Sequence, residues 1–116
     1  MKEVDLQNSV VAYLERTKML FTCTLGGLFL GKTNWKQKSI LKRQYKKGIP
    51  DVLIFEPSYY NKYNGLMIEL KIKGNYPTES QKEWIAKLNA RNYKAIVCRS
   101  LEQFIEIINA YKNEEI

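Results

Sequence analysis

Residues 48–72 read GIPDVLIFEPSYYNKYNGLMIELKI, and this stretch decides the fold. Val52 to Phe55 is a short apolar run opened by Pro50-Asp51, and Leu66 to Ile72 is a second apolar run. Both runs favour β-strands, and the stretch between them is rich in turn residues and tyrosines. The sequence therefore predicts a β-hairpin with a long loop.

The second run places ionisable groups on one face of a strand. A period of two sends one set of side chains to one face (Leu66, Ile68, Leu70, Ile72) and another set to the opposite face (Met67, Glu69, Lys71). An acid and a lysine on an otherwise apolar strand are costly unless something neutralises them. Neighbouring positions on one face lie roughly 6.6 Å apart, close enough to share one ligand.

The predicted hairpin brings Asp51 toward Glu69, with the ammonium group of Lys71 beside them. Two carboxylates of this kind suit a hard cation such as Mg²⁺, which prefers carboxylates, waters and substrate phosphate. The lysine would orient a water or stabilise charge developing on a phosphate. A plainer alternative makes Asp51 the acceptor of a turn hydrogen bond, and Glu69 and Lys71 a salt bridge on an exposed sheet.

The flanking sequence predicts the remaining elements by periodicity. A helix over residues 3–17 carries an apolar stripe (Leu6, Val10, Val11, Leu14). Further elements are expected at residues 20–25 (strand), 36–46 (short basic helix), 78–91 (helix), 95–98 (strand) and 101–111 (helix). The order α-β-(α)-β-β-α-β-α predicts a single α/β domain over residues 1–116, with a mixed sheet flanked by helices.

The charge is concentrated in one third of the chain. The net charge is +7, yet no acid occurs between Glu15 and Asp51, where nine basic residues stand together with Trp35 and Tyr45. Cations interleaved with aromatics are typical of contact with a phosphate backbone and of base stacking. The residues predicted to bind nucleic acid are Lys32, Lys36, Lys38, Lys42, Arg43, Lys46 and Lys47. The alternative is a solvated helix face.

Other compositional features exclude whole classes of chemistry. The chain has no histidine and only two cysteines, which argues against zinc sites and histidine-based triads. The cysteines stand among apolar residues and are expected to be small core residues in a reducing compartment. Neither a signal peptide nor a membrane-spanning run is evident, so we expect a cytoplasmic protein without membrane contact.

Pro50-Asp51 followed by Glu69-Leu70-Lys71 is the PD-(D/E)xK nuclease pattern. Around it, the stretches 48–51 and 65–71, then Gln81 and Trp84, closely resemble the VRR-NUC branch of that superfamily. The resemblance spans almost the whole chain and includes the opening of the first helix, Glu3 to Gln7.

The resemblance implies a restriction-endonuclease-like core and a metal-dependent phosphodiesterase. Asp51 and Glu69 would bind Mg²⁺ or Mn²⁺, with the carbonyl of Leu70 between them and Glu3 as an outer carboxylate. Lys71 would position or activate the attacking water. The implied substrate is structured or branched DNA, or duplex DNA, and the implied assembly is a homodimer that needs no small-molecule cofactor.

Two of these residues also have local explanations. Gln81 stands three residues after Thr78, which makes an ordinary capping box of the helix that follows. Glu3 heads the first helix, where the helix dipole favours an acid. The resemblance instead gives both residues a place in the catalytic site.

Two other functions compete with a DNA nuclease. One is a nucleic-acid-binding module that keeps the fold without catalysis. The other is a P-loop nucleotide hydrolase, because Gly26 to Thr33 matches G-x-x-x-x-G-K-T after an expected strand. A P-loop needs a helix directly afterwards, and Asn34-Trp35 begins a helix poorly.

Overall fold

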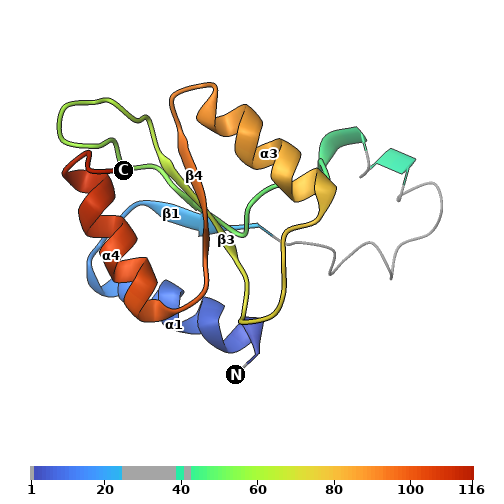
Figure 1. Ribbon diagram of the computed structural model, residues 1–116, viewed down its shortest axis with the longest axis horizontal. Coiled ribbons are helices and arrows are strands. Elements are labelled where there is room, and N and C mark those ends of the chain that lie inside the picture. The colour runs from blue at the N-terminus through green and yellow to red at the C-terminus, as the bar shows by residue number, and fades with distance from the viewer. Residues whose placement is uncertain (1, 25–38, 41–42) are drawn as a thin grey trace.

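The computed structural model describes residues 2–24, 39–40 and 43–116, and these form a four-stranded sheet between helices (Figure 1). The elements are α1 (Glu3–Arg16), β1 (Phe21–Cys23), β2 (Val52–Ile54), β3 (Leu66–Leu70), α3 (Glu79–Asn89), β4 (Lys94–Cys98) and α4 (Leu101–Lys112). Their order confirms the predicted α/β fold, with ends that differ by a few residues. Of the expected basic helix 36–46, residues 39–40 and 43–44 are helical and 45–46 are not; the others lie outside the described residues.

The sheet is mixed and has the strand order β1-β2-β3-β4. β1 pairs antiparallel with β2, and β2 pairs antiparallel with β3, which confirms the predicted hairpin. β3 and β4 are parallel and are joined through α3, as parallel neighbours require. β1 thus pairs antiparallel within the described sheet, unlike the parallel strand that precedes a P-loop, and residues 26–33 themselves lie outside the described part.

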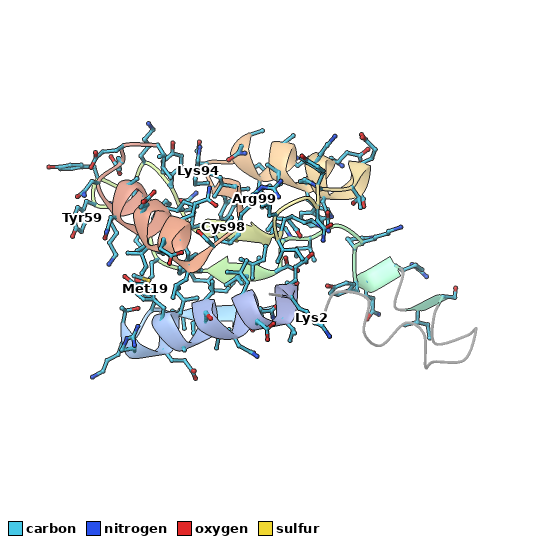
Figure 2. All side chains as sticks on the ribbon, turned by 60° about the horizontal axis from the view of Figure 1, so that its bottom comes forward. Lys2, Met19, Tyr59, Lys94, Cys98 and Arg99 are labelled. Atoms are coloured by element: carbon cyan, nitrogen blue, oxygen red, sulfur yellow. The ribbon has the colours of Figure 1, made fainter. Side chains whose placement is uncertain are left out.

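One face of the sheet carries the main core. There, α1 and α4 pack against alternate residues of the strands, and Figures 1 and 2 show both helices on the same side. The buried residues of α1 are Leu6, Val10 and Leu14, and those of α4 are Phe104, Ile107, Ile108 and Tyr111. Val11, expected in the stripe, is only half-buried because it lies toward the flank of the helix.

The opposite face of the sheet is covered by α3, which packs against β4 (Figure 1). All five residues of β3 are buried, since this central strand is covered on both faces. No residue of α3 itself is fully buried. Trp84 and Leu88, which the periodicity places inward, are half-buried and line a groove instead. None of the described helices is long and apolar enough to cross a membrane.

Candidate active site

Asp51 immediately precedes β2 and is fixed by contacts from two neighbouring strands. The register pairs Val52 with Ile68, so Asp51 falls beside Glu69 across the hairpin. One oxygen of its carboxylate, Oδ2, accepts a hydrogen bond of 2.8 Å from the backbone amide of Leu70. Its backbone carbonyl accepts another of 2.8 Å from the amide of Thr24. The side chain is therefore held in place before any ligand arrives.

The segment before Asp51 is held by α3. Gly48 has a backbone φ of +98°, and a Cβ atom there would lie 2.6 Å from the backbone of Ser80. The indole Nε1 of Trp84 donates a hydrogen bond of 3.0 Å to the carbonyl of Lys47. Only glycine combines this φ with so close an approach, which explains why a glycine stands at position 48, three residues before Asp51.

Glu69 lies near the end of β3 and is almost completely buried, with 1% of its surface exposed. Its Oε1 atom has no hydrogen-bond partner among the described residues. A buried carboxylate oxygen without a partner is costly, because its lost hydration is not replaced. The orphaned oxygen is the kind of atom that a cation or a proton would satisfy.

The pKa of the Glu69 carboxyl is raised from 4.5 to about 9. The largest cause is burial, followed by the negative charge of Asp51 and a hydrogen bond with it, and Glu3 adds a smaller repulsion. The ammonium group of Lys71 opposes these effects and lowers the pKa. Without a cation, Glu69 is therefore protonated near neutral pH.

Lys71 follows β3 and points to the same side as Glu69. Its Nζ lies 3.9 Å from Oε2 of Glu69, and only 12% of its side chain is exposed. The backbone amide of Lys71 donates to the carbonyl of Cys98 at 3.0 Å, which ties this end of β3 to β4. The plainer alternative assumed a salt bridge on an exposed sheet, but both side chains of this pair are largely buried. The structure brings Asp51, Glu69 and Lys71 together.

Glu3 lies at the edge of this cluster. Its charge is close enough to affect Glu69, but its Oε2 accepts a hydrogen bond of 3.3 Å from the side-chain amide of Asn75. Within the described ranges, no three acidic, cysteine or histidine side chains stand close enough to form a ready-made metal cage. Glu3 therefore occupies a peripheral position, and its role as an outer carboxylate stays a prediction.

Gln81 caps α3. Its side-chain Oε1 accepts a hydrogen bond of 2.8 Å from the amide of Thr78, and its own amide donates to the hydroxyl of Thr78 at 3.3 Å. This is the capping box that the spacing predicts. A catalytic role for Gln81 stays a prediction.

Three contacts near the site were not predicted from the sequence. Burial raises the pKa of the Cys23 thiol, a hydrogen bond with Gln7 opposes this rise, and the charge of Asp51 adds to it. Cys23 therefore lies near Asp51 and contacts Gln7. Cys23 is half-buried, whereas Cys98 is the core residue that we expected. Arg99 holds the chain after Lys71, because its Nη1 donates to the carbonyls of Ile72 and Asn75. Neither helical period nor motif spacing signals contacts of this kind.

The donor set fits a hard divalent cation. Asp51 and Glu69 offer carboxylate oxygens, one of them buried without a partner in the described part of the chain, and Leu70 stands between Glu69 and Lys71 in the sequence. Mg²⁺ is commonly held by one or two carboxylates together with waters and substrate phosphate, so a complete protein cage is not required. The third oxygen ligand, the carbonyl of Leu70, stays a prediction.

The basic segment that leads to Asp51 is only partly described. Arg43, Lys46 and Lys47 are exposed, as contact with a polyanion requires. The other cations predicted to bind nucleic acid (Lys32, Lys36, Lys38 and Lys42) lie outside the described residues.

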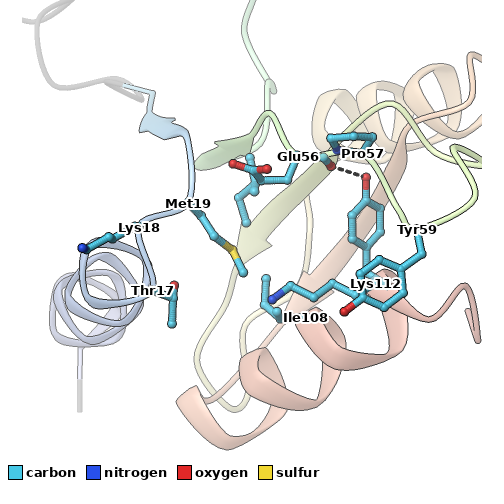
Figure 3. A pocket seen from close by; sticks show the side chains of 10 residues that line it. Thr17, Lys18, Met19, Glu56, Pro57, Tyr59, Ile108 and Lys112 are labelled. Carbon is cyan, nitrogen blue, oxygen red and sulfur yellow. Dashed lines mark hydrogen bonds between the residues drawn. The ribbon is translucent and has the colours of Figure 1, made fainter.

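A separate cavity lies at the far end of β2, away from Asp51 (Figure 3). It measures about 250 Å³, and Met19, Ile54 and Ile108 are among the residues that line it. Two other lining residues are joined by a hydrogen bond of 2.6 Å, which the hydroxyl of Tyr111 donates to the carbonyl of Glu56. It contains none of the predicted site residues, so the carboxylate cluster remains the candidate centre.

Comparisons with known proteins identify the family and the fold of this chain. The model of the VRR-NUC domain family matches residues 15–102, a range that includes Asp51, Glu69, Lys71 and Gln81 but not Glu3. A solved structure described as a "VRR_NUC domain protein" superposes with a TM-score of 0.78 at 26% sequence identity. That alignment covers 97% of this chain and 89% of the other. No curated protein matches the sequence.

Proposed function

Because this chain belongs to the VRR-NUC domain family, a family of nuclease-type fold, we propose that it is a nuclease that depends on Mg²⁺ or Mn²⁺ and hydrolyses phosphodiester bonds in DNA. The observation that carries the proposal is the buried carboxylate of Glu69, whose Oε1 has no partner in the described structure, beside Asp51 and Lys71. A purely structural strand would gain nothing from such a group. A cation removes the cost.

Asp51 and Glu69 would hold the ion, and the carbonyl of Leu70 would complete the set that the chain provides. When bound, Mg²⁺ or Mn²⁺ supplies Lewis-acid polarisation of a phosphate and a water of lowered pKa. Glu69 must lose its proton to bind a cation, because ligating carboxylates are ionised. Its raised pKa therefore makes cation binding release a proton at neutral pH.

Lys71 would act on the water or on the phosphate. Its ammonium group is compact and lies 3.9 Å from a carboxylate oxygen of Glu69, on the side of the sheet where substrate phosphate would sit. There it can orient the attacking water and offset the negative charge that develops in the transition state. Its nearly complete enclosure keeps that charge effective, because little water screens it.

The substrate we propose is branched, structured or duplex DNA, held by the basic segment through its phosphates largely without reading sequence. Nine basic residues without an intervening acid between Glu15 and Asp51 support a polyanionic partner. A homodimer is proposed as the working form, from the sequence resemblance, and the molar mass in solution tests it.

The experiment is a cleavage panel of branched, single-stranded and duplex DNA, each with Mg²⁺, Mn²⁺ or EDTA. We expect cleavage with either ion, none in EDTA, and none by Glu69→Gln although that variant still binds DNA. Glu106→Gln, the same change at an exposed position of α4, is the matched control and should cleave like the wild type.

A wild-type protein that binds DNA in every lane and cuts none with any ion would overturn the proposal. It would show instead a binding module that keeps the nuclease fold. Full activity of Glu69→Gln would refute the assignment of Glu69 to the active site. The protein would still be a nuclease, with its active site elsewhere.

A further inference from the structure

A second candidate binding surface lies on α3, outside the carboxylate cluster. It is a groove of about 520 Å³ between the basic segment and one face of this helix. Its lining residues are Lys46, Lys47, Ser80, Glu83, Trp84, Lys87, Leu88 and Arg91. We refer to it as the α3 groove.

The α3 groove carries a surplus of positive charge. Four of its side chains are cationic and Glu83 is the one acid among the lining residues. Lys87 lies in the last turn of α3 and Arg91 follows the end of the helix, where its Nη1 donates a hydrogen bond of 2.9 Å to the carbonyl of Lys87. Both side chains are exposed, as are Lys46 and Lys47 on the other wall. A concave surface of this sign raises the local concentration of polyanions.

The two walls are fixed to each other. Trp84 donates its indole hydrogen to the carbonyl of Lys47, and Gly48 packs directly on the backbone of Ser80. Figure 1 shows the chain before β2 passing the first turn of α3. These contacts fix the shape of the groove. The half-buried indole of Trp84 lies among its cationic side chains.

One wall of the α3 groove lies close in sequence to the candidate active site. Asp51 comes four positions after Lys47, so their Cα atoms lie at most about 14 Å apart. The phosphates of one strand of duplex DNA follow one another at roughly 3.4 Å along the helix axis. A strand whose phosphate reaches Asp51 would therefore pass the groove within about four nucleotides.

We propose that the α3 groove binds the sugar-phosphate backbone of the DNA on one side of the scissile bond. Lys87 and Arg91 contact phosphates, together with Lys46 and Lys47, and Trp84 packs against the sugar or an unpaired base. This assignment rests on the proposed function. It adds the second half of α3 and the turn that follows it, residues 84–91, to the nucleic-acid surface, which the sequence placed only in residues 32–47.

The test compares two lysines of the same helix. Lys87→Gln removes a cation from the groove, whereas Lys82→Gln removes one outside it, where Lys82 pairs with Glu79 at 3.5 Å. Binding of labelled duplex DNA by the full chain is measured in EDTA over a range of salt concentrations. The slope of log affinity against log salt should fall by about 0.9 for Lys87→Gln and stay unchanged for Lys82→Gln.

A second measurement reports on the indole. The sequence holds two tryptophans, so Trp35→Phe leaves Trp84 as the single reporter. Addition of DNA should quench its fluorescence, and Lys87→Gln should shift the titration to higher DNA concentration. Thermal melting of each variant establishes that it is folded.

The outcomes separate this inference from the proposed function. Equal slopes for the wild type, Lys87→Gln and Lys82→Gln, with unchanged Trp84 fluorescence, would overturn the α3 groove as a DNA contact, even if Glu69→Gln abolishes cleavage. Conversely, Lys87→Gln could change the slope although the wild type cuts no DNA under any condition. That result would support DNA binding in the α3 groove and refute the proposed nuclease activity. Neither result depends on the other, because binding is measured without metal.

Discussion

Glu69 links the protonation state of the site to the stability of the whole chain. Its pKa is about 9 in the folded protein and near 4.5 for an ordinary glutamate, so between these values the folded chain holds a proton that the unfolded chain has lost. The protonated Glu69 therefore contributes fully to the free energy of unfolding below pH 4.5. This contribution is lost as the pH rises toward 9.

We accordingly expect the metal-free protein to melt at a lower temperature at pH 8.5 than at pH 5.5. The expected difference attributable to Glu69 is several kcal/mol, and Glu69→Gln should lose most of it, because the amide stays neutral throughout. Thermal unfolding in EDTA at several pH values measures both. Identical pH profiles for wild type and Glu69→Gln would refute the linkage.

Asp51→Asn separates charge from shape at the same site. The amide oxygen can still accept the hydrogen bond from Leu70, so the fold should survive, while a carboxylate for the cation is removed. We expect cleavage to disappear. In metal-free buffer above the pKa of Glu69, about 9, melting should occur at an equal or higher temperature, since an ionised Glu69 is then no longer repelled by a charge at position 51. Wild-type cleavage rates in this variant would show that Asp51 holds no metal.

Lys71 distinguishes a catalytic role from a structural one. An exposed salt bridge is worth about 0–1 kcal/mol, whereas a group that acts on the transition state affects the rate directly. Lys71→Ala should slow single-turnover cleavage by on the order of 100-fold or more, with DNA binding retained. Lys71→Arg should restore little, because a planar guanidinium is broader than an ammonium. Near-equal rates for all three proteins would exclude this role.

At the scale of elements, the approach of the Gly48 turn to α3 determines where Asp51 lies. Gly48→Ala forces a side chain into a positive φ and also places a Cβ atom 2.6 Å from the backbone of Ser80. The control is Gly74→Ala, where φ is +93° but no atom lies within 4 Å.

Gly74→Ala should cost about 1 kcal/mol of stability from backbone conformation alone, and Gly48→Ala distinctly more. Urea unfolding of the two variants gives the comparison. Gly48→Ala should also reduce cleavage, because any shift of the turn moves Asp51. Equal losses of stability would mean that the packing on Ser80 is loose.

The basic segment gives a further prediction at this scale. Neutralising Lys42, Arg43, Lys46 and Lys47 together should weaken binding to all DNA sequences alike. The slope of log affinity against log salt should fall by roughly 0.9 for each duplex phosphate that the variant no longer neutralises. Fluorescence anisotropy with two unrelated duplexes tests both statements. An unchanged slope would make the segment a solvated surface.

Local patterns were sufficient to predict the elements and the central pair of carboxylates. The alternation in 66–72 identified β3, and the hairpin placed Asp51 beside Glu69, because antiparallel register follows from the strands themselves. The expectation failed for Trp84 and Leu88, since a helix that covers one edge of a small sheet leaves much of its apolar stripe half-exposed. Contacts such as Arg99 with residues 72–75 depend on how distant segments meet, which periodicity does not encode.

For the molecule as a whole, binding of a cation to the folded state would be linked to the folding equilibrium. An ion held by Asp51 and Glu69 stabilises the folded chain according to its concentration relative to its dissociation constant. Below the pKa of Glu69, the ion must also displace a proton. If the site binds Mg²⁺ as proposed, we expect the ion to stabilise the chain more at pH 8 than at pH 6, the opposite trend to that of the metal-free protein.

The central position of β3 also determines at what stage of synthesis the candidate active site can form completely. By the time Lys71 has left the ribosome, Asp51, Glu69 and Lys71 all exist, but β4 does not. The amide of Lys71 is held by Cys98, and parallel strands can pair only after the intervening helix has formed. If the chain is the proposed nuclease, we expect a half-synthesised chain to be inactive, because β3 then lacks the neighbour that holds its end.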